Sequence, residues 1–546
     1  MTAKTQTAPP DGGERLAISR RGLVTGALGV GLATLLTPGA ATAQPLTAPA
    51  ATRRSDVPVI RRGRDPQYES TIAVYNRRIR ANPYRVFAPR TGAETVTAVQ
   101  RIIDSGERLS VISGGHCFED FSLPADVNSV VHVGALNSVN YNADVAAYSV
   151  GSGARLLNVY ENLFRDAGVT IPGGVCYSVG VGGHVTGGGY GLLSRVHGLT
   201  VDHLVGVEVV TVDRRGQASL NYVTRRDTGD KSDLFWAHTG GGGGNFGVVT
   251  RFDFRKAQLD RGLPAPPSSV HLVTCGWPWD GVSEEQFEAF LTVFADWCVT
   301  HRASDTITNQ VFPWLIVRHR DYGGLGMVMQ VAADEALPAA KELVADLASA
   351  LRRTATDEYV SWTQMPWMNA GRLVGTSSAE NHNPNRRGKQ GSANLRQRLS
   401  SEQTAHLYRA MNSPIRGSVS AGFDIAALGG AISDVASDAT AVYQRDSVMK
   451  LLVQTFWASE SDDAPNLEWL RSTYHGLFAG GAPGYDRSTA GSYINYPNTD
   501  LSDPAWNTSG MGAGEIYYGR NYARLQRAKR RWDPNDYFRH SQSVKA

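Results

Sequence analysis

The chain has 546 residues, with 54 Lys and Arg against 51 Asp and Glu, and a formal net charge of +3. This length exceeds what one ordinary hydrophobic core accommodates, so we expect two domains. The near-balanced charge disfavours a nucleic-acid partner held by electrostatics. The four cysteines lack zinc-ligand spacing, so we expect no metal site.

The N-terminus carries the pattern of a twin-arginine signal. Arg20 and Arg21 precede an apolar run rich in Gly and Ala, and small residues before and at Ala43 suit a signal-peptidase cut. The alternative is a membrane anchor, which the small residues and a proline in the run disfavour. We therefore expect residues 1–43 to be a signal peptide that directs the chain to the twin-arginine export machinery. The secreted chain would keep no membrane anchor and would begin with a linker and N-terminal arm over 44–79.

Helices and strands alternate in the next segment. Apolar residues at helical spacing predict a helix over 93–105. A buried strand over 109–113 leads into the glycine turn 114–116. A second helix is expected over 155–167, with Gly168 as its stop signal.

Glycine is densest between Ile171 and Tyr190, around Cys176. Glycine lets backbone amides approach a ligand closely, and successive amides in such turns form an anion site. His116 ends the upstream turn, so two glycine segments each present a nucleophile. This pattern predicts a phosphate-bearing cofactor held by the backbone and tethered by side chains. It does not match the GxGxxG fingerprint of a Rossmann fold.

Three further features have competing interpretations. The glycine run 240–244 precedes a strand expected over 247–254, which favours a cofactor-lining loop over a flexible linker. His184 is expected to hydrogen-bond the backbone rather than to act as a base. Cys117, beside His116, is interpreted as a packing residue rather than a tether.

Composition changes near Lys256, where prolines mark a domain boundary. Beyond this boundary we expect a sheet covered by helices. Its strands are expected over 268–276, 311–317 and 326–332, and the helices over 284–300 and 336–352. The polar segment 376–392 is predicted to be a mobile loop at the mouth of the site. Cys275 and Cys298 could form a disulfide, but we favour the interpretation that both are buried thiols.

Three motifs occur in order: Ser113 to His116 (SGGH), Cys176 to His184 (CYSVGVGGH) and Tyr493 to Asn498 (YINYPN). From about Arg80 onward the chain resembles the FAD-linked oxidases of the vanillyl-alcohol-oxidase superfamily. The similarity is to the berberine-bridge-enzyme-like branch, and within it to actinomycete antibiotic-tailoring enzymes. Asn498 stands where that branch usually has an acid.

The resemblance implies an α+β fold. A PCMH-type FAD-binding domain would span 80–255, and a substrate domain with an antiparallel sheet covered by helices would span 256–510. Residues 511–546 would complete the FAD domain. The FAD would be bound twice, through an 8α-histidyl bond at His116 and a 6-S-cysteinyl bond at Cys176.

The implied reaction is oxidation of a hydroxyl group by hydride transfer to flavin N5, with O2 as the acceptor and H2O2 as the product. The substrate would be a sugar, secondary alcohol or lactol of a glycosylated or polyketide natural product. Tyr496 would be the base, although a core tyrosine is the alternative. Asp424 would hydrogen-bond and assist Tyr496, or else be a solvated turn acid. Val179 falls at the oxygen-gate position, where valine is associated with an oxidase.

If Asp424 occupies the position of the second tyrosine that a related antibiotic-tailoring enzyme uses, one oxidation step is favoured over two. Two rival functions remain open: a flavin-dependent oxidative cyclase or dehydrogenase on a non-sugar metabolite, and a binding protein with a vestigial flavin site. The residues expected around the cofactor are Val111, Ile112, Ser113, Gly114, Gly115, His116, Cys117, Gly173, Gly174, Cys176, Val179, Gly180, Gly182, Gly183, His184, Gly187, Tyr190, Gly191, Gly247, Val248, Val249, Asn495, Tyr518 and Asn521.

Overall fold

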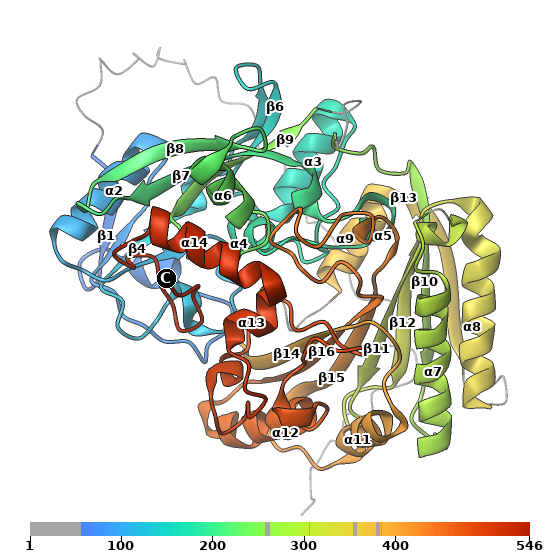
Figure 1. The fold of residues 1–546 in the computed structure, drawn as a ribbon. Coiled ribbons are helices and arrows are strands. Elements are labelled where there is room, and N and C mark those ends of the chain that lie inside the picture. Colours follow the sequence, from blue (N-terminus) through green and yellow to red (C-terminus); the bar gives the residue numbers. More distant parts are fainter. Residues whose placement is uncertain (1–55, 257–261, 305, 353–357, 378–382, 384) are drawn as a thin grey trace, which may run out of the picture. The chain divides into compact units, whose positions relative to one another are not determined.

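The computed structural model describes residues 56–256, 262–304, 306–352, 358–377, 383 and 385–546 (Figure 1). The expected signal peptide and its cut near Ala43 lie outside these residues. Within the described ranges, no helix combines the length and the apolar character needed to cross a bilayer.

Two sheets build the first half of the described chain. The four-stranded sheet has the order β1 (Val59–Arg61), β2 (Arg85–Phe87), β4 (Ser129–His132), β3 (Leu109–Ile112). The five-stranded antiparallel sheet has the order β5 (Val139–Asn142), β6 (Ala147–Gly151), β9 (Val248–Arg255), β7 (Leu204–Val212), β8 (Ala218–Thr224). The helices of this half are α1 (Tyr68–Ile72), α2 (Gly92–Asp104), α3 (Leu156–Ala167), α4 (Val181–Thr186), α5 (Ser194–His197) and α6 (Gly229–Ala237).

The first sheet begins earlier in the chain than expected. Strand β1 lies in the segment assigned to the linker and arm, yet it pairs antiparallel with β2, placing Val59 opposite Phe87. Val59 and Phe87 both contribute to a hydrophobic cluster with α2. This part of the expected N-terminal arm is therefore an edge strand of the sheet.

A seven-stranded antiparallel sheet organises the second half. Its order is β13 (Tyr359–Pro366), β10 (Ser269–Trp277), β12 (Leu325–Val331), β11 (Val311–Arg318), β15 (Ser418–Ala427), β16 (Met449–Trp457), β14 (Arg387–Leu395). The accompanying helices are α7 (Glu284–Thr300), α8 (Leu337–Leu351), α9 (Trp367–Thr376), α11 (Ser401–Asn412) and α12 (Asp463–His475). The tail adds α13 (Ala513–Tyr518) and α14 (Tyr522–Trp532). The expected antiparallel sheet covered by helices is confirmed (Figure 1).

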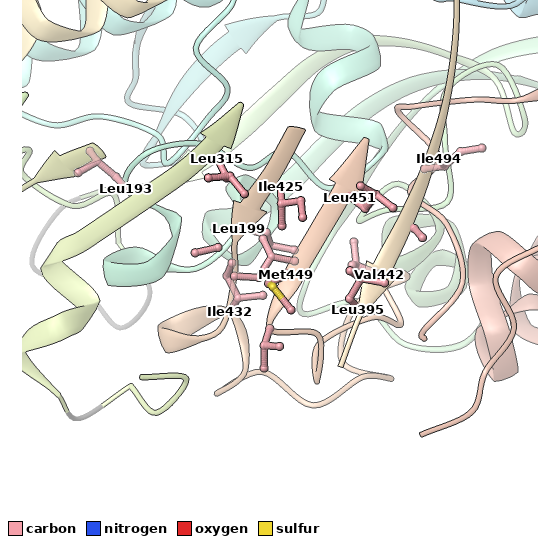
Figure 2. Packing of buried hydrophobic residues seen from close by; sticks show 14 of the residues in the cluster. Leu193, Leu199, Leu315, Leu395, Ile425, Ile432, Val442, Met449, Leu451 and Ile494 are labelled. Atoms are coloured by element: carbon pink, nitrogen blue, oxygen red, sulfur yellow. The ribbon is translucent and has the colours of Figure 1, made fainter. Parts of the chain in front are cut away.

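Side chains alternate between the two faces of this sheet. On β15, Phe423 and Ile425 join the large hydrophobic core, and Phe423 meets Phe287 of α7 edge-on at 6.3 Å between ring centroids. Figure 2 shows Ile425 gathered with core residues of other strands, such as Leu315 and Leu451. The alternate residues, including Asp424, therefore face away from this core.

The expectation of a mobile loop over 376–392 is wrong for its second half. All nine residues of β14 are buried, and β14 pairs along its length with β16. Its sequence, RGKQGSANL, has almost no apolar residues, so hydrophobic alternation could not reveal it. Ion pairs satisfy the buried charges instead, as with Arg387 and Asp463, whose Nε and Oδ1 atoms lie 2.6 Å apart.

The two cysteines of the second half are free thiols. Cys275 lies on β10 and Cys298 on α7, and both are buried. The favoured interpretation of two buried thiols is confirmed, and the disulfide alternative is wrong.

Lys389 connects three distant segments through a buried ion cluster. Its ammonium group pairs with Glu119, near the turn that carries His116, and lies 3.4 Å from Asp500 of the tail. The side chain of Lys389 is 1% exposed and that of Glu119 is 3% exposed. The substitution Lys389→Met is expected to lower the free energy of unfolding by about 3 kcal/mol, because it removes the most deeply buried of the cations that pair with these two carboxylates.

Urea denaturation of the flavin-loaded chain measures this loss. A double variant, Lys389→Met with Glu119→Gln, should recover part of it, since the second change removes one of the two buried carboxylates that Lys389 neutralised. A loss below about 1 kcal/mol for Lys389→Met would show that the remaining pairs suffice, such as that of Arg78 with Glu119.

Candidate active site

A cavity of about 350 Å³ lies where glycine turns of the first half meet strands of the seven-stranded sheet. It is lined by the turn after β3, by 174–176, 179–180 and 182–184, by the glycine run 242–247 and by residues 493–497. The sheet contributes Phe312, Trp314, Gln390, Asp424, Ala426, Leu452 and Gln454. The expected cofactor-lining role of the glycine run is therefore supported over the flexible-linker alternative.

Both expected tethers reach this cavity. His116 follows β3 and stacks on Tyr75, with ring centroids 3.7 Å apart. The Sγ atom of Cys176 lies 3.8 Å from the hydroxyl of Ser178. Burial raises the pKa of the Cys176 thiol. The fold thus brings together an imidazole and a thiol that are far apart in the sequence.

The two segments that carry these residues touch through their backbones. A Cβ atom added to Gly114 would lie 2.2 Å from the amide nitrogen of Gly180, and one added to Gly180 would lie 2.4 Å from that of Gly114. Only glycine at both positions permits this approach. Arg155 spans the contact, donating from Nη1 to the carbonyl oxygens of Gly114 and Ser178 at 2.6 Å each.

The cavity wall fits a flat, phosphate-bearing cofactor. Gly183 lines the cavity, and a Cβ added there would meet nothing within 4 Å, so the missing side chain leaves open space beside the backbone. The amides of the turn at 114–116 and a pair of nucleophiles, His116 and Cys176, border the same space. This donor set suits FAD with its pyrophosphate against backbone and its ring against the nucleophiles.

His184 is held by the backbone, as expected. Its Nε2 accepts a hydrogen bond from the amide of Gly174 at 3.2 Å. Burial, with a smaller contribution from Lys450, lowers the pKa of His184 to about 4. The imidazole is therefore neutral and already engaged near neutral pH.

Three tyrosines and one lysine cluster at one side of the cavity. The hydroxyls of Tyr496 and Tyr190 lie 2.7 Å apart. The Lys450 ammonium lies 3.8 Å from the ring centroid of Tyr190 and 3.6 Å from that of Tyr493. Burial lowers the pKa of Lys450. Burial thus disfavours the ammonium form of Lys450, while the attraction of a cation to the two ring faces acts in the opposite direction.

Opposing influences act on the Tyr496 phenol. Burial raises its pKa, the hydrogen bond with Tyr190 acts to lower it, and the charge of Asp424 acts to raise it. Tyr190 in turn has a raised pKa, through burial first and then through Tyr496. Both phenols therefore stay protonated near neutral pH, and either hydroxyl can donate the shared hydrogen bond.

Asp424 makes different contacts from those expected. It is 5% exposed on β15, so the alternative of a solvated turn acid is wrong. Its Oδ1 pairs with Arg318 at 2.6 Å, and its Oδ2 accepts from Gln454 at 2.8 Å. Among the described residues, no hydrogen bond joins Asp424 to Tyr496, because the Tyr496 hydroxyl pairs with Tyr190 instead.

Six of the expected cofactor residues do not line the cavity: Ile112, Gly173, Gly187, Val248, Tyr518 and Asn521. Ile112 and Val248 lie on strands and point into hydrophobic clusters by alternation. A Cβ on Gly187 would meet the Asn495 side chain at 2.1 Å, so this glycine packs against protein. A Cβ on Gly173 would likewise meet the Tyr160 hydroxyl at 2.7 Å.

The two tail residues in that set lie one layer behind the cavity. The Tyr518 hydroxyl donates to the carbonyl of Gly241 at 2.8 Å, which supports the glycine run from outside. The Asn521 amide donates to the carbonyls of Ser437 at 2.6 Å and Thr440 at 3.1 Å. Both support other segments rather than face the cavity.

Apart from Asp424, the residues that the sheet brings to the cavity were not among those expected. The additional residues are Phe312, Trp314, Gln390, Leu452 and Gln454, with Lys450 beside them. One signal was available: Lys450 and Gln454 are polar residues on the same face of the otherwise largely apolar strand β16.

Comparisons with known proteins agree with this geometry. Residues 83–217 match the family described as FAD binding domain, and residues 492–545 match the family described as berberine and berberine like. The aclacinomycin-N/aclacinomycin-A oxidase of Streptomyces galilaeus is 37% identical over 96% of this chain and 98% of its own. The hexose oxidase of Chondrus crispus is 33% identical over 88% of this chain and 93% of its own.

A solved structure shows the same fold. The glycopeptide hexose oxidase complexed with teicoplanin superposes with a TM-score of 0.84 at 32% identity, covering 91% of this chain and all of that one. The chain belongs to the berberine-bridge-enzyme-like family of FAD-linked oxidases. It is an FAD-binding oxidoreductase that is similar to the aclacinomycin oxidase.

Proposed function

We propose that this protein oxidises a hydroxyl-bearing carbon of a sugar or related natural product and uses O2 as the electron acceptor. The observation that carries the proposal is the position of Tyr496, whose phenol lines the same cavity as His116 and Cys176. Relatives that are named as hexose oxidases support the class of substrate. When bound, the flavin supplies the hydride acceptor and returns the electrons to O2 as H2O2.

Tyr496 is the proposed base that takes the hydroxyl proton of the substrate. A phenol is a weak base unless hydrogen bonds or positive charge stabilise the phenolate. Tyr190 is placed to donate such a hydrogen bond at 2.7 Å, and the Lys450 ammonium borders the cluster. The hydrogen bond with Tyr190 acts to lower the pKa of Tyr496, against the larger effect of burial, which keeps that pKa raised.

Asp424 is proposed to bind the substrate rather than to assist Tyr496 directly. Arg318 neutralises its charge from one side, and Gln454 fixes its second oxygen. A carboxylate held in this way retains lone pairs that accept a hydrogen bond from a sugar hydroxyl. Trp314 and Phe312 line the same cavity and supply apolar surface for a sugar ring or an aglycone.

Two further features belong to the proposal. His116 would carry the 8α-histidyl bond and Cys176 the 6-S-cysteinyl bond, and Val179 lines the cavity at the position expected to admit O2. The Arg20-Arg21 pattern supports secretion through twin-arginine export. N-terminal sequencing of chain recovered from culture medium tests the cut near Ala43.

A panel of hexoses, oligosaccharides, glycosylated polyketides and glycopeptides tests the proposed reaction. At least one compound should bleach the flavin on anaerobic mixing. In air it should yield H2O2 and a product lighter by two hydrogens, in equal amounts. Bleaching without peroxide would indicate a dehydrogenase, and a new ring without a carbonyl would indicate an oxidative cyclase. Binding without bleaching across the panel would support the binding-protein alternative.

A further inference from the structure

We propose that Arg155 couples the two flavin attachments by holding the Cys176 segment against the His116 turn, so that both nucleophiles reach one isoalloxazine ring. The inference rests on the proposed double attachment and adds the residue that positions it. Arg155 is a positioning residue, because its contacts are to the backbone of the two segments.

The contacts of Arg155 are nearly symmetrical about the two nucleophiles. Its Nη1 donates to the carbonyl of Gly114, two residues before His116, at 2.6 Å. The same atom donates to the carbonyl of Ser178, two residues after Cys176, at 2.6 Å. One guanidinium therefore fixes both segments relative to each other.

The backbone of Arg155 strengthens this role. Arg155 is the N-cap of α3 and forms an isolated antiparallel bridge with Gly180. The helix therefore anchors the guanidinium at its base, and the bridge brings it beside the Gly114–Gly180 contact. Without the guanidinium, two partly buried carbonyls would lose a charged donor.

The two segments differ in their other supports. The His116 turn follows β3, which pairs with β4, and the carbonyl of Gly115 accepts from the amide of Tyr75 at 2.9 Å. His116 also stacks on the Tyr75 ring. This turn therefore keeps its position when Arg155 is removed.

The Cys176 segment is irregular and does not extend from a paired strand as the His116 turn does; next to the cysteine, the amide of Leu157 donates to the carbonyl of Tyr177 at 3.3 Å. The Tyr160 hydroxyl donates to the carbonyl of Gly174 at 2.6 Å, and the amide of Leu156 donates to that of Val179 at 3.0 Å. The bond from Arg155 to Ser178 is the nearest side-chain anchor on the C-terminal side of Cys176. Loss of Arg155 should therefore displace the thiol before the imidazole.

The chemistry of attachment leaves no bond-making role for Arg155. Each attachment replaces a hydrogen on the imidazole nitrogen or thiol, and a hydrogen on a flavin carbon, by an N–C or S–C bond. The two hydrogens, with their electrons, pass to O2 and leave as H2O2. The reaction therefore needs only that each nucleophile reach its carbon, and position is what Arg155 controls.

The test compares full-length, flavin-loaded wild type with Arg155→Met, Arg155→Lys and Arg225→Met. Peptide mass spectrometry after acid precipitation measures the fraction of His116 and of Cys176 that carries flavin. In Arg155→Met, the flavin on Cys176 should fall roughly fivefold or more, and His116 should stay modified. The visible spectrum should approach that of Cys176→Ala. Arg155→Lys should be intermediate, because an ammonium is a compact donor without the planar fork.

Arg225→Met is the matched control. Arg225 also donates to backbone carbonyls, those of Leu204 at 2.8 Å and Asp202 at 3.0 Å, but neither of these residues lines the cavity. The Arg225→Met variant should therefore keep flavin on both His116 and Cys176. If Arg155→Met kept both attachments, or if Arg225→Met lost as much flavin from Cys176 as Arg155→Met, the role of Arg155 would be overturned. The proposed double attachment would still stand. Wild type without flavin on Cys176 would overturn the proposed double attachment, and the inference with it.

Discussion

Replacing both His116 and Cys176 with alanine is expected to give a chain whose flavin separates completely on acid precipitation. Each single replacement should leave the flavin attached through the remaining bond. The physical reason is that the imidazole and the thiol border one cavity from two segments whose backbones touch. A ring held by one nucleophile therefore still lies beside the other segment. Intact-mass measurement of the precipitated protein checks the three variants.

Cys117 provides the matched control for this experiment. It also lines the cavity and directly follows His116, but burial raises the pKa of its thiol to about 12. The tether motif of the resemblance falls on Cys176 and not on Cys117, so Cys117 should stay unmodified. Cys117→Ala should therefore keep both attachments. If Cys117→Ala lost one bond, or if His116→Ala alone released all the flavin, the assignment of the tethers would be wrong.

Tyr496→Phe is expected to lower the rate of flavin reduction by about 10²–10⁴-fold, the usual contribution of a general base, while leaving the attached flavin unchanged. The substitution removes the hydroxyl that pairs with Tyr190 and keeps the ring that packs in the cluster. Single-turnover mixing with the best substrate of the panel measures the rate, and the visible spectrum confirms cofactor content.

Tyr190→Phe separates the two phenols of this pair. It removes the proposed donor to Tyr496 and should cost about tenfold, the size of one hydrogen bond near 1.4 kcal/mol. A larger loss for Tyr190→Phe than for Tyr496→Phe would make Tyr190 the base. An unchanged rate of flavin reduction in Tyr496→Phe would show that Tyr496 is not the base and would favour the alternative of a core tyrosine.

Short-range sequence patterns predicted the positions of several helices correctly. The helices expected over 93–105 and 284–300 appear as α2 and α7 within about a residue, because apolar spacing and caps are properties of short segments. The Ser283 side chain and the Gln286 side chain of α7 form a reciprocal capping box, a signal that lies within four residues. His116 and Cys176 were identified for the same reason, because the glycine-rich turns that carry them can be recognised from a short stretch of sequence.

Other features have no local signature. Strand β14 is polar along its length, and partners such as Glu119 and Asp463, distant in sequence, make its burial tolerable. The pairing of Asp424 with Arg318 likewise joins neighbouring strands β15 and β11 across 106 positions of sequence. Asp424 therefore looked equally suited to a turn or to catalysis before the sheet was known.

The sequence by itself determined that this chain presents His116 and Cys176 on glycine turns and a tyrosine-rich motif near its end, because turn conformation and residue chemistry are encoded locally. Only the tertiary structure decided that these residues share one cavity, that Tyr190 rather than Asp424 bonds Tyr496, and that Arg155 spans the two turns. Such contacts depend on which distant segments pack together, and packing is set by the complementarity of whole sheets and helices.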